Sequence, residues 1–480
     1  MGINKNKKVG AILIQILVLA GLSTLLISAL ATWGASNLRA SRREYNRELS
    51  FQIAEAGIEY YRWHLDSDPT DYKDGTETSG PYVHDFKDKD GNIIGSFSLE
   101  ITPPVEGSTK VKIRSTGVTY SDPDASRIIE VEVAKPSLGN FAIITESSIR
   151  FGEGTEVFGP IHSNGGIRFD GLAHNIVSSA LSDYNDPDHS GGDEFAVHTH
   201  RDPVDPTPPS PVPIRTDVFE AGRQFPVPAV DFGKFTNDLS EIKTQAQASG
   251  KYFGNSGKSG YHFVLKTDGT FDAYMVTALV PVPSNCNDNQ GQFDWGTWSI
   301  KTESFIGNYP FPSNGLIFAE DDIWVDGQVD NARLLIACGH FPENKGQETH
   351  ITVNNSLSYT NYDGRDSVGL IAQGNITVGL VSENILRIDA ALIAKNDRIG
   401  RYYYRPPSDN KDRCSPYHVR DTITLYGMVG TNEDYGFSYL DGTGYQIINI
   451  IYDANLLFAP PPDFPLTTDQ YQIITWKEIK

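Results

Sequence analysis

The sequence predicts an α+β N-terminal unit, made of a long helix and a small antiparallel sheet, followed by a mainly-β domain that we interpret as an irregular parallel β-helix or solenoid. Three observations predict this fold class. Residues 11–65 carry a continuous helical pattern, residues 66–136 carry alternating strand patterns between turns, and short aliphatic β units recur after residue 138. The length of 480 residues favours two or three folding units.

The helical pattern begins with a segment apolar enough to cross a membrane. A basic lead, residues 1–10, ends at Gly10, and residues 11–33 then carry no formal charge. A helix of this length, at about 1.5 Å per residue, spans the roughly 30 Å hydrocarbon core of a bilayer. Because the apolar stretch is long and continues directly into a second helical stretch, it favours a retained anchor over a cleaved signal peptide.

The continuation, residues 36–65, contains no proline and predicts the amphipathic second half of the same helix. Apolar side chains recur there at spacings of three, four or seven residues, which places them on one face. We expect this stripe to serve helix packing; its members are Leu38, Tyr45, Leu49, Ile53, Ala56, Tyr60 and Trp63.

The basic leader, Gly10, the apolar helix and the stretch LSFQIAEAGIEYYRWHL together resemble the N-terminus of type IV minor pilins and pseudopilins of the PilX kind. The resemblance covers about residues 5–65 and extends loosely to 136. It implies cleavage by a prepilin peptidase between Gly10 and Ala11, methylation of the new N-terminus, and packing of the helix with other pilin-like subunits. It also implies a single-pass protein of the cytoplasmic membrane, or of an extracellular pilus, with its C-terminal bulk outside.

Gln15 departs from the pattern of the major pilins. The fifth residue of their mature helix is typically a glutamate that meets the N-terminus of a neighbouring subunit, and a neutral amide cannot form that ion pair. Gln15, as the expected subunit contact, therefore indicates a minor subunit. An ordinary signal anchor is the alternative, because basic residues on both sides of the apolar stretch leave the positive-inside rule ambiguous.

Residues 66–136 predict the small sheet that completes a pilin-like unit. Asp90-Gly91 marks a hairpin turn, and residues 110–114 and 128–133 alternate as strands do. The turn is no calcium loop, because Phe86 and Phe97 stand where the first and twelfth ligands would be.

Repeated short motifs predict the solenoid. Ile-Arg-Phe at 149–151 recurs at 167–169, and Leu-Ile-Ala occurs at 335–337, 370–372 and 392–394. Stacked units of this kind bury a continuous aliphatic column. We assign residues 138–180 and 315–400 to this domain, which resembles an uncharacterised solenoid-like domain of bacterial envelope proteins. The irregular period leaves a β-sandwich as an alternative.

Two further segments complete the expected organisation. Residues 181–314 form an insertion with a proline-rich linker and a hairpin around Asp268-Gly269, and residues 401–480 form a β-rich C-terminal segment.

The composition and the motifs exclude several functions. A formal charge of -21 repels phosphate backbones, so we expect no nucleic-acid partner. Residues 257–259 resemble the end of a phosphate-binding loop, but Tyr252 occupies the position of its first glycine. We therefore expect no catalytic residues, no enzymatic activity and no cofactor.

His198, His200 and Asp202 are weak candidates for a metal site, since two histidines in an H-x-H pattern on a strand point to the same side. The segment is rich in proline and glycine, where exposed His and Asp are common, so we expect no bound metal.

The three cysteines, Cys286, Cys338 and Cys414, allow at most one disulfide. We expect all three to be buried and unbonded.

The expected function is that of a structural minor-pilin-like subunit at the bacterial cell surface, in which a large β-domain serves adhesion or scaffolding. The expected partners are pilin-like subunits, the prepilin peptidase, the membrane, and surface polysaccharide or a host cell surface. The alternative is an envelope-anchored carbohydrate-active enzyme or carbohydrate-binding protein that uses a β-helix groove.

Overall fold

The computed structural model describes residues 6–104, 108–187, 189, 191–232, 234–287, 292–344, 346–408, 410–433, 435–466, 468 and 470–479. The chain divides into two compact units. Unit 1 comprises Met1–Pro104, Lys110–Ala134 and Gln470–Lys480, and unit 2 comprises Val105–Thr109 and Lys135–Asp469.

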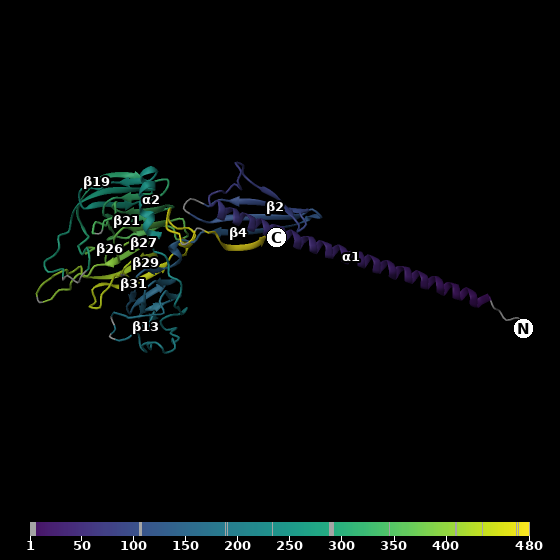
Figure 1. The fold of residues 1–480 in the computed structure, drawn as a ribbon, viewed down its shortest axis with the longest axis horizontal. Coiled ribbons are helices and arrows are strands. Elements are labelled where there is room, and N and C mark those ends of the chain that lie inside the picture. Colours follow the sequence, from purple (N-terminus) through teal and green to yellow (C-terminus); the bar gives the residue numbers. More distant parts are fainter. Residues whose placement is uncertain are drawn as a thin grey trace. The chain divides into compact units, whose positions relative to one another are not determined.

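Unit 1 is a long helix and an antiparallel sheet (Figure 1). The helix is α1 (Asn6–Ser67), and the sheet has the order β1-β2-β3-β4-β32. The strands are β1 (Tyr82–Lys87), β2 (Ile93–Thr102), β3 (Val111–Thr119), β4 (Asp122–Ala134) and β32 (Gln472–Ile479). The predicted hairpin at Asp90-Gly91 is confirmed, because β1 and β2 pair antiparallel on either side of it.

The last strand of unit 1 comes from the far end of the chain. β32 pairs antiparallel with β4, with Trp476 opposite Val131, and the ring of Trp476 lies 5.9 Å from that of Phe51 on α1. The prediction that residues 401–480 form one C-terminal segment is therefore corrected. A strand pattern shows which residues extend, but it does not show which sheet they join.

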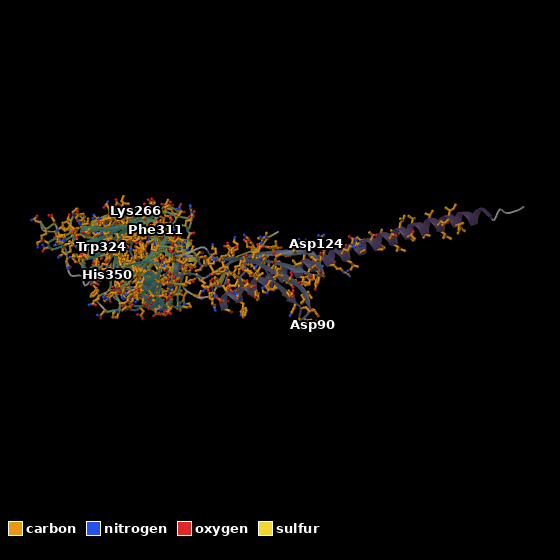
Figure 2. All side chains as sticks on the ribbon, turned by 90° about the horizontal axis from the view of Figure 1, so that it is seen from above. Asp90, Asp124, Lys266, Phe311, Trp324 and His350 are labelled. Carbon is orange, nitrogen blue, oxygen red and sulfur yellow. A yellow bond between two sulfur atoms is a disulfide. The ribbon has the colours of Figure 1, made fainter. Side chains whose placement is uncertain are left out.

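The C-terminal half of α1 packs on this sheet. Its buried residues follow helical spacing and contact apolar side chains of β2, β3 and β4. The buried face consists of Ser50, Ile53, Ala54, Gly57, Ile58, Tyr61 and Leu65. The N-terminal half has no such partner within the described residues. Its large apolar side chains, from Ile12 to Trp33, are each at least 55% exposed and project all round the helix (Figure 2).

Glycines allow the helix and the sheet to approach closely. A Cβ added at Gly117 on β3 would overlap the backbone of Ser50 and Ala54 on α1. A Cβ at Gly57, the single glycine of residues 36–65, would overlap Ser115 and Phe97 of the sheet. The position of α1 therefore depends on the absence of side chains at these two residues.

We expect Gly117→Val to destabilise unit 1 by about 1–3 kcal/mol or more, because the added side chain must displace helix backbone. Hydrogen exchange of the α1 and β3 amides measures this directly. Gly34→Val is the matched control, since a Cβ there meets nothing within 4 Å. Equal exchange rates in the two variants would contradict the close approach.

Unit 2 is built mainly of parallel ladders of short strands. The longest ladder runs, in spatial order, through β15 (Arg223–Gln224), β11 (Val177–Ser179), β8 (Ile161–Ser163), β5 (Ile143–Thr145), β29 (Val419–Thr431), β27 (Ile385–Ala394), β25 (Ser367–Ala372), β22 (Arg333–Cys338), β20 (Leu316–Ala319) and β16 (Lys251–Phe253). A second runs through β17 (Gly260–Leu265), β21 (Ile323–Val329), β23 (Ile351–Thr352), β26 (Ile376–Val378), β28 (Ile399–Arg401) and β30 (Tyr435–Gly436).

Two further parallel ladders complete the arrangement. One contains β21, β24 (Leu357–Tyr359), β27, β29, β31 (Gly444–Tyr452), β7 (Thr155–Phe158) and β10 (Leu172–Ala173). The other contains β6 (Ile149–Phe151), β9 (Ile167–Phe169) and β14 (Val197–His198). The remaining elements are α2 (Lys234–Ala248), the short helices η1 (Leu138–Asn140) and η2 (Ala454–Leu457), and the antiparallel strands β18 (Thr270–Leu279), β19 (Ile300–Pro310), β12 (Asp183–Tyr184) and β13 (Glu194–Phe195).

The repeated motifs lie in register with one another. Ile149–Phe151 pairs residue by residue with Ile167–Phe169, and the rings of Phe151 and Phe169 are 4.6 Å apart. The Leu-Ile-Ala motifs of β25 and β27 align residue for residue, whereas that of β22 is offset by one position. Stacking of like residues gives buried aliphatic columns. One such column is Ile323, Ile351, Ile376 and Ile399.

The structure corrects the predicted insertion at 181–314. β16 and β17 lie inside these residues, and they extend the ladders of β20 and β21 directly. β5, which follows η1 in the chain, pairs with β29 from the C-terminal part. The order of the strands within the ladders therefore differs from their order along the chain. A repeat period in the sequence cannot show the spatial order.

The structure also corrects the expectation of three unbonded cysteines. Cys286 and Cys414 form a disulfide with a Cα–Cα distance of 4.9 Å, although 128 residues separate them in the chain. Both are fully buried beside Leu380, Tyr402 and Tyr404. Cys338 is buried and unbonded, as expected.

Candidate functional site

The helix residues predicted from the sequence all lie on α1, but they do not share one environment. Gly10 and Ala11 are helical, and their side-chain surroundings lie outside the described part of the chain. Gln15 is exposed. The subunit contact and the processing site therefore remain predictions.

The predicted stripe differs from the face that packs on the sheet of unit 1. Within the stripe, Ile53 is fully buried, and Leu49, Ala56 and Tyr60 are partly buried. Leu38, Tyr45 and Trp63 are 64%, 67% and 67% exposed. Leu38 and Tyr45 precede Ser50, where the buried face begins, whereas Trp63 lies beyond it but on another side of the helix. These three exposed side chains are therefore not part of the face of α1 that packs on the sheet.

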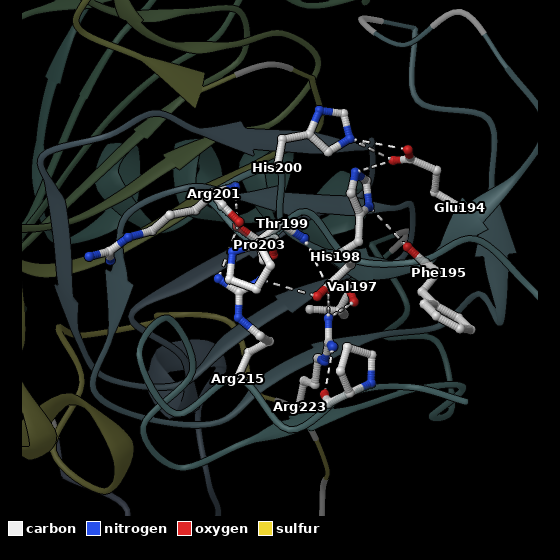
Figure 3. A network of polar contacts seen from close by, with 12 residues as sticks. Glu194, Phe195, Val197, His198, Thr199, His200, Arg201, Pro203, Arg215 and Arg223 are labelled. Carbon is white, nitrogen blue, oxygen red and sulfur yellow. Dashed lines mark hydrogen bonds and ion pairs between the residues drawn. The ribbon is translucent and has the colours of Figure 1, made fainter. Parts of the chain in front are cut away.

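Unit 2 brings two of the weak metal candidates together with buried carboxylates. His198 Nε2 lies 2.5 Å from Glu194 Oε2 and 3.4 Å from Asp186 Oδ2. His200 Nε2 lies 3.0 Å from Glu194 Oε2 (Figure 3). Glu194, His198 and Asp186 are each less than 5% exposed. These four residues, Asp186, Glu194, His198 and His200, are called the histidine–carboxylate cluster below.

The third candidate does not belong to this cluster. Asp202 is exposed and is not among the residues whose ligand atoms lie within 4.8 Å of one another. Sequence reasoning missed Glu194, although it shares even spacing with His198 and His200. In an extended chain, residues two or four positions apart point to the same side.

Buried ion pairs hold the segment that carries the two histidines. Arg223 Nη1 donates to the carbonyl of Val197 at 2.7 Å and pairs with Asp205. Arg215 Nη1 pairs with the same carboxylate at 3.3 Å, and the Thr199 amide donates to it at 3.2 Å (Figure 3). Side-chain hydrogen bonds and ion pairs, and not a strand ladder, thus hold the proline-rich linker in place. Because these contacts are not local, the propensities of the linker residues did not predict a defined conformation.

The cluster opens onto a groove of about 910 Å³. Asp186 and His200 contribute to its wall. Aromatic, cationic and apolar side chains line the rest, among them Arg150, Phe151, Tyr184, Arg398, Tyr439 and Leu440. A groove of this size is large enough for an extended small ligand.

No protein-family model and no curated protein matches the chain. A solved structure similar to it is the crystal structure of the competence-associated pilin ComZ from Thermus thermophilus. The match has 12% sequence identity and a TM-score of 0.28, and it covers 90% of this chain and 98% of that chain. A TM-score this low does not establish a shared fold.

A second histidine of unit 2 is held between two acids. His262 Nδ1 lies 2.8 Å from Glu303 Oε2, and its Nε2 lies 3.1 Å from Asp326 Oδ2. Burial lowers the pKa of His262, but hydrogen bonds and the charges of Asp326 and Glu303 outweigh that effect and raise it above the ordinary 6.5. The ring of Tyr274 on β18 also lies close to the imidazole, with the ring centroids 5.8 Å apart. Since both nitrogens face carboxylates, the charged imidazolium is the form that satisfies the site.

We expect the stability of unit 2 to fall as the pH rises through the raised pKa of His262. The stabilisation by the imidazolium is complete below the unfolded pKa of about 6.5 and is lost above the folded one. Chemical denaturation of the full chain between about pH 5.5 and about pH 9 measures it. In His262→Gln this part of the pH dependence should vanish, and an unchanged profile in that variant would contradict the assignment.

Proposed function

We propose that this chain is a minor-pilin-like structural subunit that is anchored in a membrane and assembled into, or displayed on, a type IV pilus or pseudopilus. One observation carries the proposal. A single 62-residue helix has an exposed apolar N-terminal half and a C-terminal half packed on an antiparallel sheet. The exposed half suits a bilayer and equally suits lengthwise packing against helices of other subunits.

Two features, one of unit 2 and one of the whole chain, support a location outside the cytoplasm. The buried Cys286–Cys414 disulfide is stable in oxidising compartments and rare in the cytosol. The acidic composition, with 61 Asp and Glu against 40 Lys and Arg, suits a soluble exposed surface. We therefore propose that the bulk of the chain is extracytoplasmic and that α1 is its one membrane segment.

The parallel ladders support the interpretation of unit 2 as an irregular β-solenoid. In-register pairing of like residues over several strands is the packing that such folds use. We propose that this unit acts in adhesion or as a scaffold and that it is not an enzyme.

Co-purification with filaments tests the assembly proposal. In a pilus-forming bacterium, the full chain should appear in the sheared filament fraction. Leu26→Arg, which places a charge in the exposed apolar half, should deplete it from that fraction while the folded units persist. A wild-type chain that stays wholly in the membrane fraction would contradict assembly.

A second candidate function is polysaccharide binding in the groove of unit 2, favoured by its mixed aromatic and charged lining. Tyr439→Ala should then weaken retention of the full chain on immobilised polysaccharide. Tyr362→Ala, at an exposed aromatic outside the groove, is the control. Equal retention of the two variants would exclude the groove as the binding site.

A further inference from the structure

The orientation of His198 creates a conflict that a cation would resolve. Its Nδ1 lies 3.0 Å from the backbone carbonyl of Phe195, which can only accept a hydrogen bond. Nδ1 therefore carries the proton of the neutral ring, and the lone pair of Nε2 points at Glu194 and Asp186. Nε2 is buried and makes no hydrogen bond within the described part of the chain. A lone pair facing two carboxylates needs a positive charge between them.

A proton on Nε2 or a metal ion among the three groups can supply that charge. Among the described residues, the ion-pair partners of Glu194 are three histidines, His189, His198 and His200. Asp186 Oδ2 also lies 3.6 Å from Arg168 Nη1, so the permanent cation of the cluster pairs with Asp186 and not with Glu194.

We propose that Glu194, His198 and His200, together with Asp186, bind one divalent transition-metal ion, with Zn²⁺ as the representative. The ligand atoms lie within 4.8 Å of one another. Tetrahedral Zn²⁺ with bonds of about 2.0–2.2 Å places its ligand atoms roughly 3.3 Å apart. The separations of 3.0 Å and 3.4 Å in the cluster are close to this value. The 2.5 Å between His198 Nε2 and Glu194 Oε2 must lengthen by roughly 0.8 Å to reach it.

The surroundings of the ligands resemble those of protein metal sites. A metal-binding histidine usually donates its second ring N–H to a carbonyl or carboxylate, as His198 Nδ1 does to Phe195. Asp170 accepts a hydrogen bond from the backbone amide of His200 at 2.8 Å and another from the Nε of Arg168 at 2.8 Å. The first of these bonds holds His200, which follows β14, in place.

Two other histidines of unit 2, His350 and His262, are arranged differently. His350 Nδ1 accepts the amide of Asn375 at 2.9 Å, so that its proton resides on Nε2, which faces Asp294 at 3.5 Å. His262 presents both nitrogens to acids and is satisfied as an imidazolium. His198 differs from these two because its Nδ1 faces a backbone carbonyl while its Nε2 faces two acids.

The ligand types also select the metal. Imidazole nitrogen favours Zn²⁺ and similar first-row ions, whereas Ca²⁺ and Mg²⁺ prefer sites made of oxygen. The ion would link β13, β14 and the turn at Asp186 on the wall of the groove. Its function would be to hold this proline-rich part of unit 2 in place.

The test is a Zn²⁺ titration of the untagged, metal-stripped full chain in detergent, in competition with a chromophoric chelator. We expect one Zn²⁺ per chain, no competition by Mg²⁺ or Ca²⁺, and a rise in thermal unfolding temperature with bound metal. His198→Ala and His200→Ala should each weaken binding by about 100-fold or more. His174→Ala, at a histidine paired with Glu220 outside the cluster, should leave binding unchanged.

Because His198→Ala alters a buried residue, the partly exposed His200→Ala provides the decisive variant if the former does not fold. Absorption bands of tetrahedral Co²⁺ in the wild-type chain give a readout that requires no substitution. Absence of Zn²⁺ binding, or binding that survives in His200→Ala, would overturn the proposal. Loss of binding in His350→Ala but not in His200→Ala would also overturn it, by assigning the ion to the other cluster.

Discussion

Removal of residues 11–33 is expected to release the chain from membranes into the soluble fraction and to leave both units folded. The large apolar side chains of this segment are exposed in the protein, and together they favour the bilayer by roughly 4–7 kcal/mol on the scale of membrane insertion. The buried face of α1 begins at Ser50, so the deletion removes no buried contact of unit 1.

Membrane sedimentation after a carbonate wash measures the release, and hydrogen exchange of the β3 and β27 amides measures the integrity of the two units. Trp63→Ala is the control, because it removes an exposed apolar side chain from the C-terminal half of the same helix. A deleted chain that still sediments with membranes would show that another surface provides the attachment.

The second large effect is expected at the disulfide. Cys286→Ser with Cys414→Ser should lower the unfolding free energy of unit 2 by about 2–5 kcal/mol, since the bond restricts a long segment of the unfolded chain. The bond also ties two otherwise irregular segments together within a small apolar cluster. The loss should therefore be greatest for residues 280–287 and 402–418.

Thermal unfolding with and without reductant measures this effect. Reductant should lower the unfolding temperature of the wild type and of Cys338→Ala, which lacks only the unbonded thiol, but not that of the double variant. An equal response to reductant in the wild type and the double variant would contradict the role of the bond.

Much of the fold could be predicted because it depends on local patterns. The run from residue 11 to 33 is apolar over the length of a membrane helix, Asp90-Gly91 is a turn signal between two strand patterns, and the Ile-Arg-Phe pair repeats a strand motif. Each has the expected conformation or pairing. Two of the histidines proposed for a metal site, His198 and His200, do lie together because an H-x-H pattern in extended chain places both rings on one side.

What could not be predicted depends on long-range partners. The pairing of β32 with β4 and that of β5 with β29 join segments that are remote in sequence, and their own residues do not specify a partner. The Cys286–Cys414 disulfide likewise joins two segments that are remote in sequence. Glu194 and Asp186 reach the histidines because β12 and β13 pair and buried arginines hold the following linker. A pattern of prolines and glycines indicates only the absence of regular structure.

We propose that the N-terminal helix is processed as that of a pilin, and the identity of the first residue of the mature chain tests this most directly. The measurement is intact mass together with N-terminal sequencing of the chain recovered from a pilus-forming bacterium, with a Gly10 substitution as the control that blocks cleavage. Processing as a pilin would give a chain that begins at a methylated Ala11 in the wild type and keeps its leader in the Gly10 variant. A wild-type chain that retains residues 1–10, or one cleaved after residue 33, would contradict it.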